Sequence, residues 1–106
     1  MFIINGEHWD IQYVFPEHPA LKRALTNEYA LGCCDDRTKT IFINNTLSGK
    51  LLKKVLGHEI THAAMFSYNV DLSYEQEEII ADLIATYGDE IVFITNKIFN
   101  KLREGY

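Results

Sequence analysis

The residues most able to do chemistry in this chain are two histidines and a glutamate at a fixed spacing. His58, Glu59 and His62 form the pattern H-E-x-x-H. Residues four apart share one face of a helix, so the two imidazoles can bind one metal ion. Glu59 then lies beside the ion, where it can accept a proton from a metal-bound water. This pattern is typical of zinc hydrolases, most often peptidases.

A catalytic zinc ion needs a third protein ligand and one open position. No histidine follows His62, because the other two, His8 and His18, precede the motif. A carboxylate is therefore the expected third ligand. The downstream candidates are Asp71, Glu75, Glu77, Glu78 and Asp82.

Helical spacing favours Glu78 among these acids. Glu78 and Asp82 are four apart and share a face with Ala81 and Ala85, whose small side chains would allow close approach to the motif helix. We expect Glu78 to bind the metal and Asp82 to hydrogen-bond the second nitrogen of a metal-bound histidine. An acidic first turn also stabilises a helix dipole, so the acids alone have a purely structural interpretation.

Alternating patterns predict the strands that support this site. The dipeptide Asn5-Gly6 separates apolar runs at 2–5 and 9–15, which is typical of a β-hairpin. Runs at 29–34 and 40–44 flank a polar turn and predict a second, antiparallel hairpin. This hairpin leads directly into the motif helix.

Three helices are expected in the second half of the chain. Apolar spacing predicts the motif helix at about 46–66. Ser73 and Gln76 form a capping box that predicts the start of the next helix. Gly88-Asp89 is expected to end that helix, and a third helix is expected at about 90–103.

Composition restricts the partners. The chain has 106 residues, 47% of them hydrophobic, and a net charge of −5, so one folded domain is expected and nucleic acid is a poor partner. No apolar run is long enough for a membrane helix. The first residues show neither a basic segment nor a cleavage site, so a cytoplasmic location is expected.

The two cysteines, Cys33 and Cys34, are adjacent. An ordinary disulfide between neighbours on a strand is strained, so two free thiols in a reducing compartment are expected. A thiol near the metal that acts as an extra ligand or as a redox switch is the alternative interpretation.

The segment Glu78-Ile79-Ile80-Ala81-Asp82 resembles the E-x-x-A-D signature of the gluzincins, a class of zinc peptidases. The resemblance implies that Glu78 binds zinc and that Asp82 supports a zinc-binding histidine. Over residues 28–95 the layout is similar to the ImmA/IrrE family of small intracellular metallopeptidases. Many of these enzymes are encoded on phages and mobile elements, where they relieve repression by cleaving a repressor or causing its cleavage.

The resemblance implies an α+β fold of the zincin-like, minimal metalloprotease type, formed by a single domain at 1–106. A short antiparallel or mixed sheet would pack on the H-E-x-x-H helix and on two further C-terminal helices. The strand at 40–44 is expected at the edge of the sheet beside the cleft. There Ile41, Phe42 and Ile43 would bind an extended substrate as an added strand.

The expected function is that of a zinc-dependent metallo-endopeptidase with Glu59 as general base. Its substrate would be a specific intracellular protein, such as a transcriptional repressor or another regulatory protein. Two alternatives are a catalytically silent zincin-fold module that acts by binding a protein partner, and a metal-dependent hydrolase of a non-peptide amide. The sequence does not specify an oligomeric state.

Overall fold

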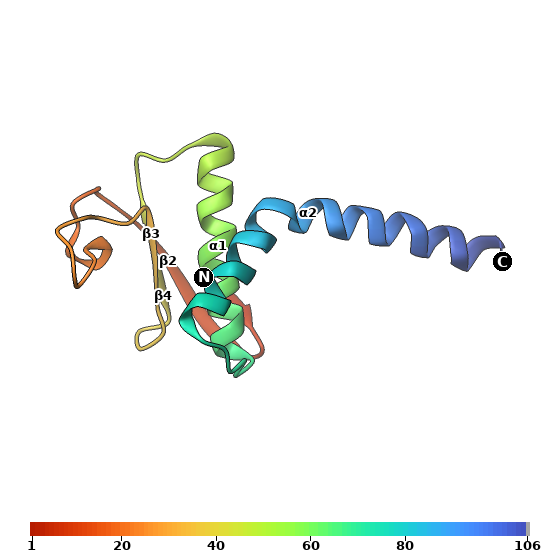
Figure 1. The fold of residues 1–106 in the computed structure, drawn as a ribbon, viewed down its shortest axis with the longest axis horizontal. Helices are drawn as coiled ribbons and strands as arrows, with labels where there is room; N and C mark the ends of the chain where they lie inside the picture. Colours follow the sequence, from red (N-terminus) through yellow and green to blue (C-terminus); the bar gives the residue numbers. More distant parts are fainter. Residues whose placement is uncertain (106) are drawn as a thin grey trace.

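The chain begins with the β-hairpin that the sequence predicts. In the computed structural model, which describes residues 1–105, β1 (Phe2–Ile4) pairs antiparallel with β2 (Glu7–Val14) (Figure 1). Asn5 and Gly6 connect them with φ angles of 48° and 77°. Both residues are therefore in the left-handed region that a two-residue type I′ hairpin turn requires.

The second hairpin is also present and completes a mixed sheet. β3 (Gly32–Asp35) pairs antiparallel with β4 (Thr40–Asn44), and β4 pairs in parallel with β2. The parallel pair needs a crossover, which is a long connection that contains a 3-10 helix, η1 (Pro19–Leu21). The resulting sheet has four strands in the order β1-β2-β4-β3.

This strand order contradicts the prediction that β4 is an edge strand. β4 has β2 on one side and β3 on the other, so its backbone is paired on both sides. Ile41 and Ile43 are fully buried in the core, and Phe42 stacks against His18 on the opposite face. The edge position from which Ile41, Phe42 and Ile43 were expected to bind a substrate as an added strand is therefore wrong, and β3 is the edge strand on this side.

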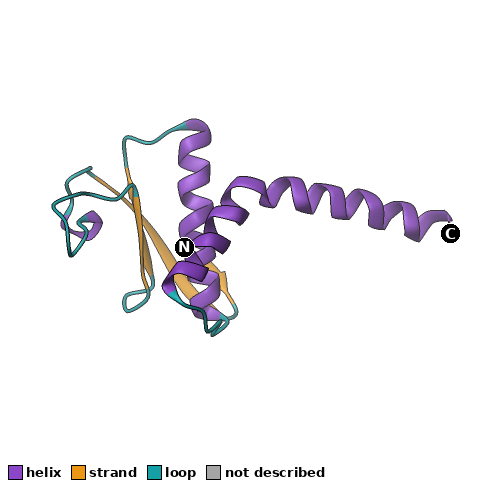
Figure 2. Cartoon of the chain, viewed as in Figure 1, coloured by secondary structure: helices purple, strands orange, loops and turns teal. Residues whose placement is uncertain are grey.

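α1 (Gly49–Ser67) is the predicted motif helix and covers one face of the sheet (Figure 2). The core between helix and sheet is formed by Trp9, Ile41, Ile43 and Ala63. The indole nitrogen of Trp9 donates a hydrogen bond of 2.9 Å to Ser67 Oγ. This contact joins β2 to the last turn of α1 and fixes that end of the helix against the sheet.

A single helix, α2 (Tyr74–Gly105), follows in place of the two that the sequence predicts. Its start is as expected: the Ser73 N–H donates to Gln76 Oε1 and the Gln76 N–H donates to Ser73 Oγ, each at 3.1 Å. The predicted break at Gly88-Asp89 is wrong. A glycine inside a helix costs about 1 kcal/mol relative to alanine, which is too little to end a helix of 32 residues.

α1 lies between the sheet and the first half of α2. Ala81 is fully buried in this helix contact. A Cβ added to Gly57 would lie 3.4 Å from the Cα of Ala85, so small residues on both helices permit close approach. Beyond Gly88 every described residue of α2 is exposed, and the helix projects away from the rest of the chain (Figure 1). No helix within residues 1–105 has both the length and the hydropathy needed to cross a bilayer.

Candidate metal centre

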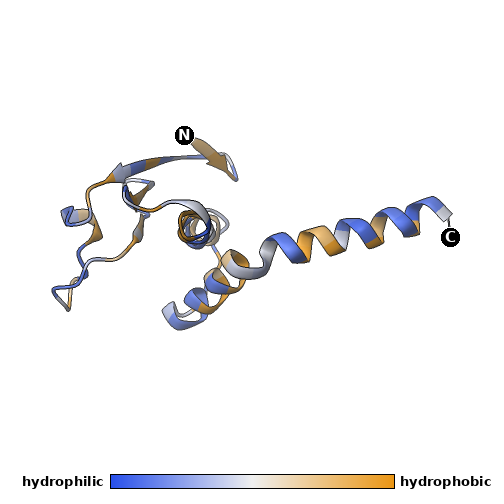
Figure 3. Cartoon of the chain, turned by 90° about the horizontal axis from the view of Figure 1, so that it is seen from above, coloured by the Kyte–Doolittle hydropathy of each residue, from blue (hydrophilic) through white to orange (hydrophobic). Residues whose placement is uncertain are grey.

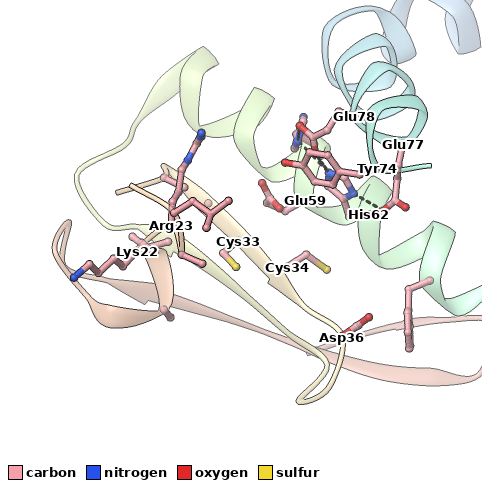
Figure 4. Close-up of a pocket in the computed structure, with 18 of the residues that line it drawn as sticks. Lys22, Arg23, Cys33, Cys34, Asp36, Glu59, His62, Tyr74, Glu77 and Glu78 are labelled. Carbon is pink, nitrogen blue, oxygen red and sulfur yellow. Dashed lines mark hydrogen bonds and ion pairs between the residues drawn. The ribbon is translucent and has the colours of Figure 1, made fainter. Parts of the chain in front are cut away.

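Three potential ligand atoms converge where α1 meets the start of α2 (Figure 4). His58 Nε2 and His62 Nε2, one helical turn apart on α1, are separated by 3.2 Å. Glu78 on α2 places Oε1 at 2.7 Å from His62 Nε2 and Oε2 at 3.4 Å from His58 Nε2. This is the one group of three such residues with converging ligand atoms that we find within residues 1–105.

The spacing of these atoms fits a zinc ion. Nitrogen and oxygen ligands lie about 2.0–2.1 Å from zinc, and two ligands of a tetrahedral site are then about 3.3 Å apart. The separations of 3.2 Å between the two nitrogens and 3.4 Å between His58 Nε2 and Glu78 Oε2 are close to this value, whereas the 2.7 Å between His62 Nε2 and Glu78 Oε1 is that of a direct hydrogen bond. Two imidazoles and one carboxylate are also a donor set that catalytic zinc uses, because it leaves one position open.

Each histidine is oriented by a second carboxylate. His58 Nδ1 lies 2.9 Å from Asp82 Oδ1, and His62 Nδ1 lies 2.6 Å from Glu77 Oε1. When each Nδ1–H donates a hydrogen bond to its carboxylate, each Nε2 carries a lone pair that faces the other potential ligand atoms. Burial alone would lower the pKa of His62, but the hydrogen bond that it donates to Glu77 and the charges of the surrounding glutamates outweigh burial, so the net shift of the pKa is upward.

The structure places Asp82 against a histidine, as the sequence suggests, whereas the role of Glu77 was missed. From the sequence, Glu77 is one of several acids in the first turn of the helix that could be the third ligand. Glu77 lies four residues before Ala81, and Ala81 is the residue of α2 that is fully buried. Residues four apart share a helix face, so the small Ala81 indicates that Glu77 also faces α1. Asp71 and Glu75 are not part of the converging group.

Glu59 lies beside this centre, in a space that Gly32 leaves open. Its residue is only 8% exposed, and Gly32 of the edge strand β3 lies against its side chain. A Cβ on Gly32 would lie 2.9 Å from Val55 Cγ1, 3.0 Å from Glu59 Cγ and 3.2 Å from Glu59 Oε2, so any larger residue would have to displace these side chains. Burial raises the pKa of Glu59 above its ordinary value, although the charges of His58 and His62 oppose the shift.

A cleft of about 740 Å³ opens onto these residues. His58, Glu59, His62 and Glu78 form one wall, and β3 with the chain segment 20–26 forms the other. Figure 4 shows Glu59, His62 and Glu78 on the side of the helices and Cys33 and Cys34 on the strand. An extended ligand lying along β3 would therefore pass close to the three converging atoms.

Cys33 and Cys34 are free, half-buried thiols that line this cleft. Burial raises the pKa of Cys34 to about 12, with a smaller contribution from the charge of Glu59. Burial also raises the pKa of Cys33. Both thiols are therefore protonated at neutral pH, and neither belongs to the group of converging ligand atoms.

No protein-family model matches this chain, and comparisons with curated proteins and with solved structures likewise find no significant match. The functional inference therefore depends on the geometry of the site.

Proposed function

We propose that this chain is a zinc-dependent metallo-endopeptidase of gluzincin type, with a zincin-like fold similar to that of the ImmA/IrrE family. The observation that carries the proposal is the convergence of His58, His62 and Glu78, with Asp82 and Glu77 behind the two histidines. A carboxylate behind each histidine is the arrangement that metal-binding histidines use to fix tautomer and ring orientation.

Zinc, when bound by these three residues, would supply Lewis-acid chemistry by polarising a carbonyl and acidifying water. Glu59 would accept the proton from the attacking water and then donate it to the leaving amine. Its burial suits this task, since a carboxylate with a raised pKa is a stronger base and holds the proton until the amine departs. A module that only binds a partner would need no buried base at this position.

The strand that would bind the substrate is β3. It pairs with β4 on one side only, and it lines the cleft that contains the metal ligands. Its free edge would pair with an extended segment of the substrate by backbone hydrogen bonds. The glycine that opens the strand, Gly32, would then set how closely that segment approaches Glu59.

The substrate we propose is one specific protein. From the resemblance, a regulatory protein such as a transcriptional repressor is the first candidate, in a cytoplasmic setting. The cleft is open to solvent, so specificity would come largely from surfaces outside it.

The test uses a library of quenched-fluorescent peptides and zinc-loaded protein, with Glu59→Gln as the matched variant. The wild type is expected to release fluorescence from a subset of the library, and Glu59→Gln is expected to bind zinc equally but lose at least about 100-fold in rate. Equal rates for wild type and variant would contradict a general-base role for Glu59. Hydrolysis that persists after zinc removal would contradict metal dependence.

A further inference from the structure

The part of α2 that follows Asp82 carries many exposed apolar side chains, and Figure 3 shows apolar stretches alternating with polar ones along the projecting helix. Ten large apolar side chains between positions 83 and 102 are each about half exposed or more. They are Leu83, Ile84, Tyr87, Ile91, Val92, Phe93, Ile94, Ile98, Phe99 and Leu102. Within residues 1–105, α2 packs against α1 through its first half, and no other element covers these side chains.

These side chains form one face of the helix. At about 100° per residue, Ile84, Ile91 and Ile98 point in nearly the same direction around the helix axis. The remaining side chains of this set, except Phe93, point no more than about 80° to either side of that arc. The opposite side is polar and contains Asp89, Glu90, Asn96, Lys97, Asn100 and Glu104. Phe93 projects on that polar side. The segment is therefore amphipathic, as expected for a helix that packs against another helix.

The exposed area is large enough for a stable interface. At about 200 Å² for each large apolar side chain, the nine on this face that are about half exposed leave roughly 900 Å² uncovered. The largest apolar patch on a typical monomer is about 300–600 Å², and a standard interface covers about 800 Å² on each partner. Most of the stability of a helix in a protein also comes from packing of its apolar face, so covering this face would stabilise α2.

The charges indicate what covers this face. Glu90 and Lys97 lie on the same flank of the helix, next to Ile94. The other flank is bordered by Val92 and Phe99, with Arg103 over the Phe99 ring near the C-terminal end. In an antiparallel pair of helices, each flank meets the same flank of the partner. Glu90 of one copy then faces Lys97 of the second copy, and the two-fold axis generates this pair twice. A parallel pair would place the charged flank against Val92 and Phe99.

We propose that this chain forms a homodimer through antiparallel pairing of α2 over residues 82–105, centred between residues 93 and 94. About 24 residues of each helix overlap in this register, which is about 36 Å. Phe99 and Leu102 of one copy lie beside Ile84 and Tyr87 of the other. The proposal is independent of the metal centre.

The first test is the mass of the full chain in solution by analytical ultracentrifugation, with a neighbouring pair of variants. The wild type is expected to be a dimer at micromolar concentration. Ile94→Asp, at a side chain that is 47% exposed on the apolar face, is expected to raise the dimer dissociation constant about 30-fold or more. Phe93→Asp, at a side chain that is 67% exposed on the polar side, is expected to leave it within about threefold.

A monomeric wild type at 100 µM would overturn the proposal, and so would equal effects of the two variants. Assembly only with a different protein would likewise overturn it.

The second test addresses orientation without removing any apolar contact. Glu90→Lys and Lys97→Glu are each expected to weaken their own homodimer roughly 3- to 10-fold, because each faces a like charge twice. Mixed in equal amounts, the two variants are expected to form a heterodimer in preference to either homodimer, because both contacts become attractive. The antiparallel register would be overturned if each variant alone dimerised as strongly as the wild type. It would also be overturned if the mixture showed no preference for the heterodimer.

Discussion

Gly32 of β3 lies against the side chain of Glu59 of α1, so closely that a Cβ at position 32 would come within 3.0 Å of Glu59 Cγ. Gly32→Ala is therefore expected to displace the Glu59 carboxylate together with Val55 Cγ1, which would lie 2.9 Å from the added Cβ, while leaving His58, His62 and Glu78 in place. A misplacement of about 1 Å in a catalytic group costs up to about 100-fold in rate. We expect peptide hydrolysis to fall about 10- to 100-fold with zinc stoichiometry unchanged. Gly105→Ala, at a position with no neighbour within 4 Å, is the matched control.

The carboxylate behind His62 gives a second prediction. Glu77→Ala removes the hydrogen bond to His62 Nδ1, and loss of such a partner weakens metal binding about 10- to 100-fold. Glu75→Ala removes an acid from the same first turn that is not part of the metal centre, so its zinc affinity is expected to stay within about twofold. Competition against a fluorescent zinc chelator measures both. Equal affinity in the two variants would show that Glu77 contributes only to the helix dipole.

The buried thiol of Cys34 predicts a dependence of stability on pH. Its pKa is raised to about 12 in the folded chain, against about 8.5 in an unfolded chain. The stability from this group is thus complete below about pH 8.5, and it is lost as the pH rises towards 12 because the unfolded chain releases the proton first. Urea unfolding should show that the free energy of unfolding falls between pH 7 and pH 10, and that it falls less in Cys34→Ser than in the wild type. Rapid alkylation of native Cys34 at pH 8 would contradict its raised pKa.

The continuity of α2 through Gly88 gives a prediction on stability. If the helix runs unbroken, Gly88→Ala removes an unfavourable glycine and is expected to stabilise the fold by about 0.5–1 kcal/mol. The added Cβ would lie 3.3 Å from Ile84 Cγ2, which requires only a small side-chain shift. Helicity by circular dichroism should rise slightly. A loss of helicity or stability would indicate that the chain turns at Gly88, as the sequence suggests.

Local spacing explains what the sequence predicts well. The H-E-x-x-H pattern, the Asn5-Gly6 turn and the Ser73/Gln76 capping box each depend on residues within a few positions, and each appears where expected. Small residues at Ala81 and Ala85 indicate the close helix contact that brings Glu78 to the histidines.

The remaining features depend on long-range packing, which spacing does not specify. The position of β4 inside the sheet follows from its parallel pairing with β2, across a connection that carries no regular pattern. Gly32 against Glu59 and Glu77 against His62 are contacts between separate elements. Gly88 has a strong turn propensity in the sequence, yet the flanking helical residues outweigh it.

The central claim is a zinc site made by His58, His62 and Glu78, and metal content tests it most directly. Elemental analysis of wild type and Glu78→Ala, each purified with zinc and then dialysed, should give one zinc per chain for the wild type and much less for the variant. No zinc in the wild type, or full retention by Glu78→Ala, would contradict the proposed metal centre.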